Sequence, residues 1–337
     1  MQKRKIWENF LQWVLPCVLL VIALVLSIYD FNNKMEIAIQ TVVDDQAEQI
    51  GLYYAAGVED KLKALGNITD AVASIMAARL DRGEAFLNEK LDTLMKASDA
   101  YMVVYCATNG TGFLNDRRQI DMTELNYYDS ILGETPHYLF TRSDGINGQM
   151  AFIYVCPITN SGNVNGYLLS YMEPAEMSDL FENSVYGDRA FFSLVDRNGT
   201  IMACYGATQG TKILQNDFWN SLKGVAESLG SWTLFDRQQQ KGDNGILHVN
   251  ENGVGKILCH FPIADTAWNL VVGIDESYLS GIQQSFRGPI VDLIVKISIS
   301  IAAALIVITV INVLVRIKVS EHLSLIHISE PTRLRRI

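Results

Sequence analysis

The sequence of 337 residues predicts an α+β protein in which a long N-terminal helix carries two antiparallel-sheet lobes, flanked by two transmembrane helices. Three observations predict this architecture. An uncharged apolar run of about twenty residues lies near each end of the chain. A long proline-free stretch with apolar residues three or four positions apart follows the first run. The same series of short β-rich runs then occurs twice. The mean hydropathy of +0.14 also indicates segments that lie in a membrane.

The first transmembrane helix is predicted at residues 10–29, after a short cytoplasmic N-terminus at 1–9. The run FLQWVLPCVLLVIALVLSIY contains no charge, and its length matches a hydrocarbon core of ~30 Å. A cleaved signal peptide is the alternative, since the basic residues at 3–5 resemble its leader. No small-x-small cleavage site follows Leu26, however, so a membrane anchor is favoured.

The second transmembrane helix is predicted at residues 292–316, around the run ISISIAAALIVITVINVLV. Basic residues lie at 3–5 before the first helix and at Arg316 and Lys318 after the second. Because positive residues stay on the cytoplasmic side, both termini are expected in the cytoplasm of a bacterial cell, with residues 30–290 outside its plasma membrane. This exported region carries 18 basic and 33 acidic residues.

The charge of the chain argues against nucleic-acid binding. Lys and Arg total 27 against 37 Asp and Glu, which gives a net charge of -10, and an acidic surface repels a phosphate backbone. Disorder and a collagen-like structure are excluded as well, because the chain has 7 Pro, 24 Gly and no low-complexity tract.

Four cysteines lie in the exported region, where disulfides are permitted. Each is in a strand-like apolar run, where a cysteine commonly packs as a small hydrophobic side chain. Free thiols are therefore favoured over disulfides for Cys106, Cys156, Cys204 and Cys259.

Residues 30–97 are predicted to form a helical stalk and a second, shorter helix. The stalk contains no proline up to residue 79, and its apolar residues recur at helical spacing. Glycine weakens a helix by about 1 kcal/mol relative to alanine, which allows a kink or a break. Three glycines interrupt the stalk: Gly51, Gly57 and Gly66. The second helical stretch is at 84–97.

Residues 98–185 and 186–286 are each predicted to form an antiparallel lobe. The first contains AYMVVYCATNGTGFL, MAFIYVCPI, the turn NSGNVNG and YLLSYM. The second contains AFFSLVDRNGTIMACYG, KILCHFPI, the turn ADTAW and NLVVGID. Each has an Asn-Gly turn after its first strand and a proline that ends a later strand, at Pro157 and Pro262. The two halves form an internal repeat of architecture.

This arrangement between two transmembrane helices resembles the double-Cache sensor domain, a tandem of PAS-like lobes carried along one helix. The resemblance covers residues 30–286. It is carried by AYMVVYCATNGTGF, NYYDSILG, YVCPITNSGNVNGYLLSYM, FFSLVDRNGTIMACYG and FPIADTAWNLVVGIDESYL. It implies the extracytoplasmic sensor region of a bacterial signalling protein, with no catalysis in this chain. It also implies a parallel homodimer, formed through the stalk and transmembrane helices, in which ligand closure displaces the second transmembrane helix.

The resemblance implies that the membrane-distal lobe, at about 101–179, holds a small molecule between its sheet and a capping helix and loop. Eight tyrosines lie in this stretch: Tyr101, Tyr105, Tyr127, Tyr128, Tyr138, Tyr154, Tyr167 and Tyr171. Their hydroxyls and rings suit a small polar organic ligand. The predicted ligand-binding residues are Tyr105, Tyr127, Tyr128, Arg142, Asp144, Tyr154 and Tyr171. For each tyrosine a simple core role is the alternative, and for Arg142 a solvated loop position.

Amino-acid-binding members of this family carry an Arg shortly before an aromatic pair on the capping helix, and an Asp at the end of the last strand of the lobe. Here the pair is Tyr127 and Tyr128, but Leu125 stands at the Arg position and Tyr171 at the Asp position. An α-amino acid is therefore not expected. Arg142 is the candidate for a substitute anion contact, although a solvated loop position is the favoured interpretation of this residue. The membrane-proximal lobe lacks a comparable aromatic cluster, which indicates a structural or relaying role.

No catalytic site, metal site or cofactor is expected. The sequence contains no HExxH, CxxC, GxSxG, SxxK, P-loop or GxGxxG motif. A hydrolase, a metalloenzyme and a nucleotide-binding enzyme are thereby disfavoured.

The cytoplasmic tail at 317–337 is short: 22 residues follow Val315. Its end, LSLIHISEPTRLRRI, resembles the translated read-through of a sequencing adapter, so the natural sequence is expected to depart from it at about residue 323. The intact protein would then carry a histidine kinase, a GGDEF diguanylate cyclase or a chemoreceptor output. A basic tail near anionic lipid is the alternative.

A different interpretation of the whole chain is a membrane-anchored exported protein that binds a partner or cell-wall component without signalling.

Overall fold

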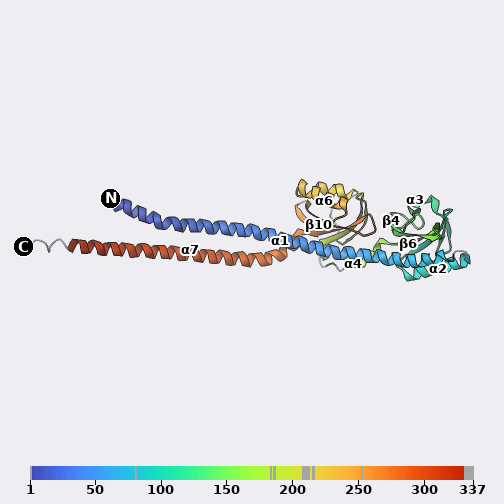
Figure 1. Cartoon of the computed structure of the whole chain (residues 1–337), viewed down its shortest axis with the longest axis horizontal. Coiled ribbons are helices and arrows are strands. Elements are labelled where there is room, and N and C mark those ends of the chain that lie inside the picture. Colours follow the sequence, from blue (N-terminus) through green and yellow to red (C-terminus); the bar gives the residue numbers. More distant parts are fainter. Residues whose placement is uncertain are drawn as a thin grey trace, which may run out of the picture. The chain divides into compact units, whose positions relative to one another are not determined.

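The computed structural model describes residues 2–79, 82–182, 184, 187–206, 213–214, 217–251 and 253–329 (Figure 1). The chain divides into two compact units. One consists of Met1–Val42 with Ser280–Ile337, and the other of Val43–Leu279. The first unit contains the N-terminal part of helix α1 (Gln2–Ala77) and nearly all of helix α7 (Glu276–Ser329). The second contains both sheets.

Both predicted transmembrane segments lie on these two helices. By length and composition, α1 from Val18 onward and α7 over Val291–Val315 are long and apolar enough to cross a membrane. Their large apolar side chains are exposed, for example Leu26 at 62% and Ile299 at 64%. Exposed apolar side chains over this length are expected of helices whose solvent is lipid.

The stalk glycines do not break the helix, contrary to the expectation of a kink or break, because α1 is continuous to Ala77. A Cβ atom at Gly51 would overlap the ring of Phe261, and one at Gly66 would lie 2.9 Å from the Tyr138 hydroxyl. The glycines therefore let both sheets approach the helix backbone, and this packing offsets the helix propensity that glycine lacks.

The first lobe is a six-stranded antiparallel sheet in the order β3-β2-β1-β6-β5-β4. Its strands are β1 (Met102–Ala107), β2 (Thr111–Leu114), β3 (Gln119–Asp121), β4 (His137–Thr141), β5 (Ala151–Asn160) and β6 (Asn163–Met172). The short helices η2 (Met122–Glu124) and α3 (Tyr128–Ile131) lie between β3 and β4 and cap one face. Helix α2 (Glu84–Ala97) precedes this lobe and packs with α1 on the other face.

The second lobe is a five-stranded antiparallel sheet in the order β8-β7-β11-β10-β9. Its strands are β7 (Ala190–Asp196), β8 (Ile201–Gly206), β9 (Gly245–Glu251), β10 (Val254–Pro262) and β11 (Trp268–Asp275). Its cap consists of α5 (Phe218–Lys223) and α6 (Leu229–Lys241), between β8 and β9. Three short helices join the lobes: η3 (Pro174–Met177), α4 (Ser178–Glu182) and η4 (Gly187–Arg189).

The two lobes share one topology. In each sheet the first strand pairs with the last strand of that lobe, β1 with β6 and β7 with β11. In each, the capping segment comes after the first strands of the lobe, after β3 in the first and after β8 in the second, and three antiparallel strands follow it. The predicted α+β fold with two PAS-like lobes is therefore confirmed.

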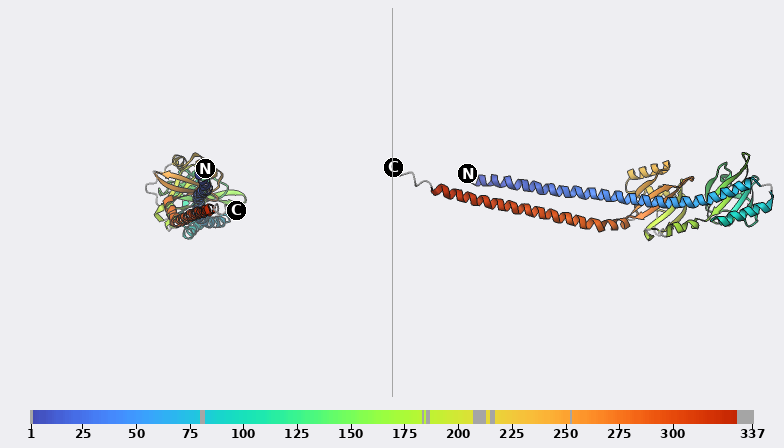
Figure 2. Two further views of the ribbon diagram at one scale, coloured as in Figure 1. Left: turned by 90° about the vertical axis from the view of Figure 1, so that its left-hand side faces the viewer. Right: turned by 60° about the horizontal axis from the view of Figure 1, so that its bottom comes forward.

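Each sheet has one face toward α1 and one toward its own cap. Figures 1 and 2 show the two sheets along successive stretches of α1, with α6 and α3 on the faces turned away from it. One apolar core joins α1, α2 and the α1-facing side of both sheets, while each cap encloses a separate core. The four cysteines of this unit are free thiols, as expected: Cys106, Cys156, Cys204 and Cys259.

Candidate functional site

The cap of the first lobe is organised around the buried carboxylate of Asp144, in the loop after β4. Its Oδ1 atom accepts hydrogen bonds of 2.7 to 2.9 Å from three backbone amides, those of Ile146, Asn147 and Gly148. Its Oδ2 atom accepts one from the Tyr101 hydroxyl at 2.8 Å. Burial alone would raise the pKa of Asp144, but these hydrogen bonds outweigh it and hold the pKa below its ordinary value. The carboxylate is thus ionised and fully paired.

Two further predicted residues complete this cluster. The Tyr127 hydroxyl donates to the Asp144 carbonyl oxygen at 2.7 Å and lies 3.2 Å from the Tyr171 hydroxyl. Since Tyr127 has a single proton to donate, Tyr171 is the donor to Tyr127. Burial raises the pKa of Tyr127 to about 12 and that of Tyr171 well above its ordinary value, so both remain neutral. The structure therefore brings Tyr127, Asp144 and Tyr171 together.

Tyr128 and Arg142 are the other two predicted residues on the segments around this cluster. Tyr128 begins α3 and is partly buried against the cap core. Arg142 directly follows β4 and has an exposed side chain. Neither is among the residues that line the cleft beside the cluster.

Tyr105 and Tyr154 lie on the opposite face of the sheet, in the core shared with α1. The Tyr154 hydroxyl lies 2.9 and 3.0 Å from the two carboxylate oxygens of Asp70 on α1. The Tyr105 hydroxyl donates to the Asn165 carbonyl at 3.1 Å. Side chains alternate between faces along a strand, and the register sets these two residues opposite to Tyr171. The sheet therefore separates them from the Asp144 cluster.

A cleft of about 510 Å³ opens beside the cluster, between η2 and the loop that carries Asp144. It is lined by Arg118, Ile120, Asp121, Glu124, Leu125, Asn126, Ser143, Gly145 and Ile146. One guanidinium, two carboxylates and two neutral polar side chains thus face a space large enough for a small organic molecule.

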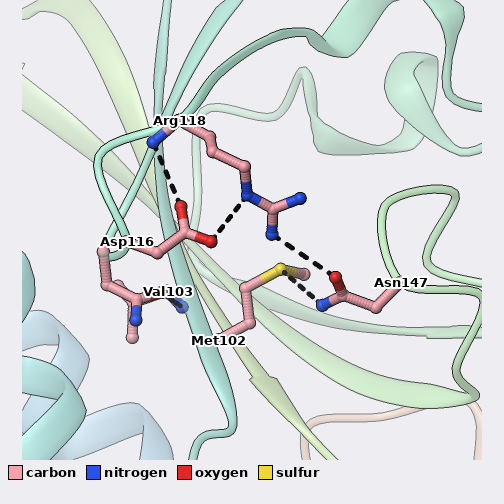
Figure 3. Close-up of polar contacts among 6 residues, drawn as sticks. Met102, Val103, Asp116, Arg118 and Asn147 are labelled. Atoms are coloured by element: carbon pink, nitrogen blue, oxygen red, sulfur yellow. Dashed lines mark hydrogen bonds and ion pairs between the residues drawn. The ribbon is translucent and has the colours of Figure 1, made fainter.

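Arg118 is held in place at this cleft (Figure 3). Its Nε atom donates to Asp116 Oδ2 at 2.6 Å, and its Nη2 atom lies 3.4 Å from Asn147 Oδ1. Asn147 in turn reaches Met102 Sδ at 3.5 Å. The guanidinium therefore connects the cleft to β1 and to the loop of Asp144. Because it retains N–H groups that none of these bonds uses, it can donate hydrogen bonds to an anionic or carbonyl oxygen of a ligand.

Tyr101, Arg118 and Asn147 are absent from the residues predicted from the sequence. Tyr101 belongs to the recognised group of tyrosines, but its partner Asp144 is 43 residues away. Arg118 follows the β2–β3 turn, where an exposed basic residue carries no distinguishing signal. The glycines that flank Asn147 do indicate a tight loop, which is the one local sign of the amide nest around Asp144.

The two positions that the resemblance drawn from the sequence compares with an amino-acid clamp hold neutral side chains, Leu125 and Tyr171. Leu125 packs against the cap core and Gly145, and Tyr171 is completely buried near the end of β6. Among the described residues, no group of three or more His, Cys, Asp or Glu side chains is placed to hold a metal ion.

No protein-family model matches the chain, and no curated protein matches it. Several solved structures do match the chain. The extracellular domain of rpHK1S-Z16, named as a histidine kinase, has a TM-score of 0.55 at 15% identity over 72% of this chain and 98% of that one. The ligand-binding domain of the Pseudomonas fluorescens chemoreceptor CtaA, in complex with L-serine, has a TM-score of 0.56 at 13% identity over 71% and 99%.

The sensory domain of the Campylobacter jejuni chemoreceptor Tlp3, with isoleucine bound, has a TM-score of 0.52 at 16% identity over 72% of this chain and 95% of that one. At these identities the likeness is one of fold. The matched part, 71 to 72% of this chain, thus shares the fold of these extracytoplasmic domains of a histidine kinase and two chemoreceptors, which agrees with the resemblance drawn from the sequence.

Proposed function

We propose that this chain is the extracytoplasmic small-molecule sensor region of a two-pass bacterial receptor, with its ligand at the cap of the first lobe. The observation that carries the proposal is that the last strand of the second lobe continues directly into the C-terminal helix. The last strand of the second lobe, β11, ends at Asp275, and α7 begins at Glu276 with no linker between them. A change in the lobes would therefore pass directly into a helix that is apolar enough to cross a membrane.

The ligand is proposed to be a small polar organic molecule held in the cleft beside the Asp144 cluster. Arg118 supplies a cationic group there, and Asp121 and Glu124 supply anionic ones. A ligand that draws on Arg118 competes with its bond to Asn147, which shares the loop of Asp144. Recognition and loop geometry would thus be coupled through a single side chain.

The neighbouring structures support this class of ligand without identifying it. CtaA is seen with L-serine and Tlp3 with isoleucine. In this chain the enclosed cluster contains one charged group, Asp144, which already makes four hydrogen bonds. An amino acid would therefore use the charged groups of the cleft instead of the interior.

The receptor is proposed to act as a parallel homodimer through the stalk and transmembrane helices, within a lipid bilayer. Its output would be a histidine kinase, a diguanylate cyclase or a chemoreceptor module. Exposed apolar residues continue along one face of α1 beyond the membrane segment, for example Val42 at 55% and Tyr53 at 74% exposure. Such a stripe suits a helix that pairs with another copy.

The test is thermal unfolding of the full chain in lipid nanodiscs against amino acids, carboxylates, amines, purines and sugars. A ligand at 100 times its Kd stabilises the protein by about 2.7 kcal/mol. Arg118→Ala is expected to abolish the stabilisation. Tyr105→Phe, on the opposite face of the sheet, is the matched control and is expected to retain it. Stabilisation that survives Arg118→Ala but is lost in Tyr105→Phe would overturn the proposed site.

A further inference from the structure

The start of strand β11 in the second lobe packs against the sheet of the first lobe. Trp268 is the first residue of β11, and its side chain is 6% exposed. The centroid of its ring lies 5.2 Å from that of Phe152 on β5 and 6.2 Å from that of Tyr138 on β4. All three side chains belong to the core that faces α1. Trp268 therefore forms a direct contact between the two lobes.

The two strands that Trp268 contacts are joined by a loop of the proposed ligand site. Thr141, at the end of β4, pairs with Ala151, at the start of β5. The residues between them, 142–150, form the loop that lines one side of the cleft in the first lobe. Phe152 directly follows Ala151. A displacement of the loop would therefore move the ring that lies against Trp268.

This loop is held together by its own hydrogen bonds. The Asp144 amide donates to the Gln149 carbonyl at 2.8 Å, and the Thr141 hydroxyl donates to the Ser143 carbonyl at 2.6 Å. The Asp144 carboxylate accepts three further amides of the loop. A fully bonded network of this kind is rigid. A change in the position of the loop is therefore passed to β4 and β5 instead of being absorbed within the loop.

Strand β11 extends from the contact with the first lobe to the beginning of α7. It is a central strand of its sheet, hydrogen-bonded to β7 on one side and to β10 on the other. Asp275 ends the strand, and Glu276 begins α7. Alternate side chains of β11 face the same core, and these are Trp268, Leu270, Val272 and Ile274. The contact with the first lobe is thus at one end of a well-bonded strand, and the apolar helix is at the other.

The β4–β5 hairpin is also attached to α1, which offers a second route for a signal. The Tyr138 hydroxyl donates to the Leu62 carbonyl at 2.9 Å, and the Tyr154 hydroxyl lies 2.9 Å from Asp70 Oδ1. Among the described residues, by contrast, the hairpin meets Trp268 through ring packing without a hydrogen bond. Hydrogen bonds fix the hairpin to α1, so relative movement is easier at the packed rings. The hairpin would then pivot on α1 and press on Trp268.

We infer that Trp268 transmits a ligand-induced displacement of the β4–β5 hairpin to α7 through β11. The inference rests on the ligand site proposed for the first lobe, and it names the route by which that site acts on the C-terminal helix. In this route α1 is the support of the hairpin, and β11 is the element that moves. Trp268 is a positioning residue, because it acts on α7 without lining the cleft of the first lobe.

The test perturbs the loop by substitution and uses no ligand, so its result is independent of the ligand screen. The full chain in lipid nanodiscs is labelled with fluorotryptophan, and the fluorine resonance of Trp268 is assigned by its loss in Trp268→Phe. Asp144→Asn removes the charge that holds the loop amides and keeps the size of the side chain. It is expected to shift the Trp268 resonance by more than its linewidth. The matched control is Asp92→Asn, which removes a carboxylate paired with Arg117 on the surface and should leave the resonance in place.

The resonances of Trp219 and Trp232 report on the cap of the second lobe in the same spectra. They are expected to stay in place in Asp144→Asn, because the cap lies on the other face of the sheet from Trp268. An unchanged Trp268 resonance would overturn the inference. So would shifts of Trp219 and Trp232 as large as that of Trp268, since they would indicate a general loosening of the protein.

Amide hydrogen exchange of the same samples measures whether the effect continues along β11. Asp144→Asn is expected to accelerate exchange in residues 268–278 by about threefold. The acceleration should disappear when Trp268→Leu is added. It should persist when Tyr138→Phe is added, because this variant removes the bond to α1 and keeps the ring. The absence of acceleration, its persistence with Trp268→Leu or its loss with Tyr138→Phe would overturn the inference, and the last result would assign the route to α1.

Discussion

The two lobes have the same topology but differ in whether the polar groups buried under their caps are hydrogen-bonded. In the first lobe the cap closes on a carboxylate with four hydrogen bonds, and its two buried tyrosines pair with the same loop. In the second lobe, atoms of Gln239, His260 and Asn269 under the cap have no hydrogen-bond partner among the described residues. A satisfied network stabilises its loop, whereas an unsatisfied one lowers stability. The two copies of the fold therefore differ: the polar groups under the first cap are hydrogen-bonded, and several under the second cap are not.

The largest effect is expected for Asp144→Ala. The change leaves three amides and the Tyr101 hydroxyl without their acceptor in a buried site, which should lower the free energy of unfolding by about 4 kcal/mol. Urea unfolding followed by tryptophan fluorescence measures it. The exposed Asp121, which bonds only Thr123, is the control, and Asp121→Ala should cost about 1 kcal/mol. Equal effects of the two variants would remove the special role of the Asp144 cluster.

The second lobe should carry an acid sensitivity that originates at His260. Below pH 6.5 the imidazole of the unfolded chain takes up a proton, while the folded ring stays neutral down to a pKa of about 4. Stability is therefore lost as the pH falls through this window, by about 3 kcal/mol in total. Denaturant midpoints between pH 7 and pH 4 should fall less steeply in His260→Phe. An unchanged slope in the variant would show that His260 does not control it.

An intermediate effect is expected for Tyr101→Phe, which removes one donor to Asp144 and keeps the ring. The loss should be about 2 kcal/mol, since the bond is to a charged and buried acceptor. The pKa of Asp144 should rise in the variant, because one hydrogen bond that stabilises the carboxylate is lost. An NMR titration of the full chain with labelled carboxyl carbons measures the direction in which the pKa of Asp144 changes. If the pKa of Asp144 did not change in Tyr101→Phe, the Tyr101 hydroxyl would not be stabilising the ionised carboxylate.

The smallest effect, and one of opposite sign, is expected for Gln239→Leu in the absence of ligand. The variant replaces a buried amide with an unpartnered nitrogen by an apolar side chain of similar size. Such a change should stabilise the lobe by about 1 kcal/mol. Urea unfolding measures it beside Tyr101→Phe. If Gln239→Leu instead destabilised by as much as Tyr101→Phe, the two caps would not differ in the way described.

Much of the architecture could be predicted because it depends on local patterns. Charge-free runs mark the two apolar helices, and alternating runs that end at Asn-Gly turns mark the paired strands of each lobe. The stalk glycines were assigned the wrong consequence. Glycine propensity is a local property, while the contacts of Gly51 with Phe261 and of Gly66 with Tyr138 are made across the fold.

The site was less predictable, since it depends on strand register. Tyr105 and Tyr171 lie on neighbouring strands, and only the pairing of β1 with β6 shows that they face opposite sides of the sheet. The polar cluster of the second lobe was missed for another reason. A search for aromatic residues does not detect two carboxamides and a histidine that are far apart in the sequence and meet under α6.

The central claim, that a ligand in the lobes controls a signal across the membrane, is tested most directly by a chimera. Residues 1–318 would be joined in continuous helical register to the cytoplasmic kinase of a characterised receptor, and autophosphorylation measured in nanodiscs with a ligand from the binding screen. The account predicts a ligand-dependent change in kinase activity that is absent in Arg118→Ala and retained in Tyr105→Phe. A ligand that binds the chimera without altering kinase activity would contradict the account and indicate a membrane-anchored binding protein instead.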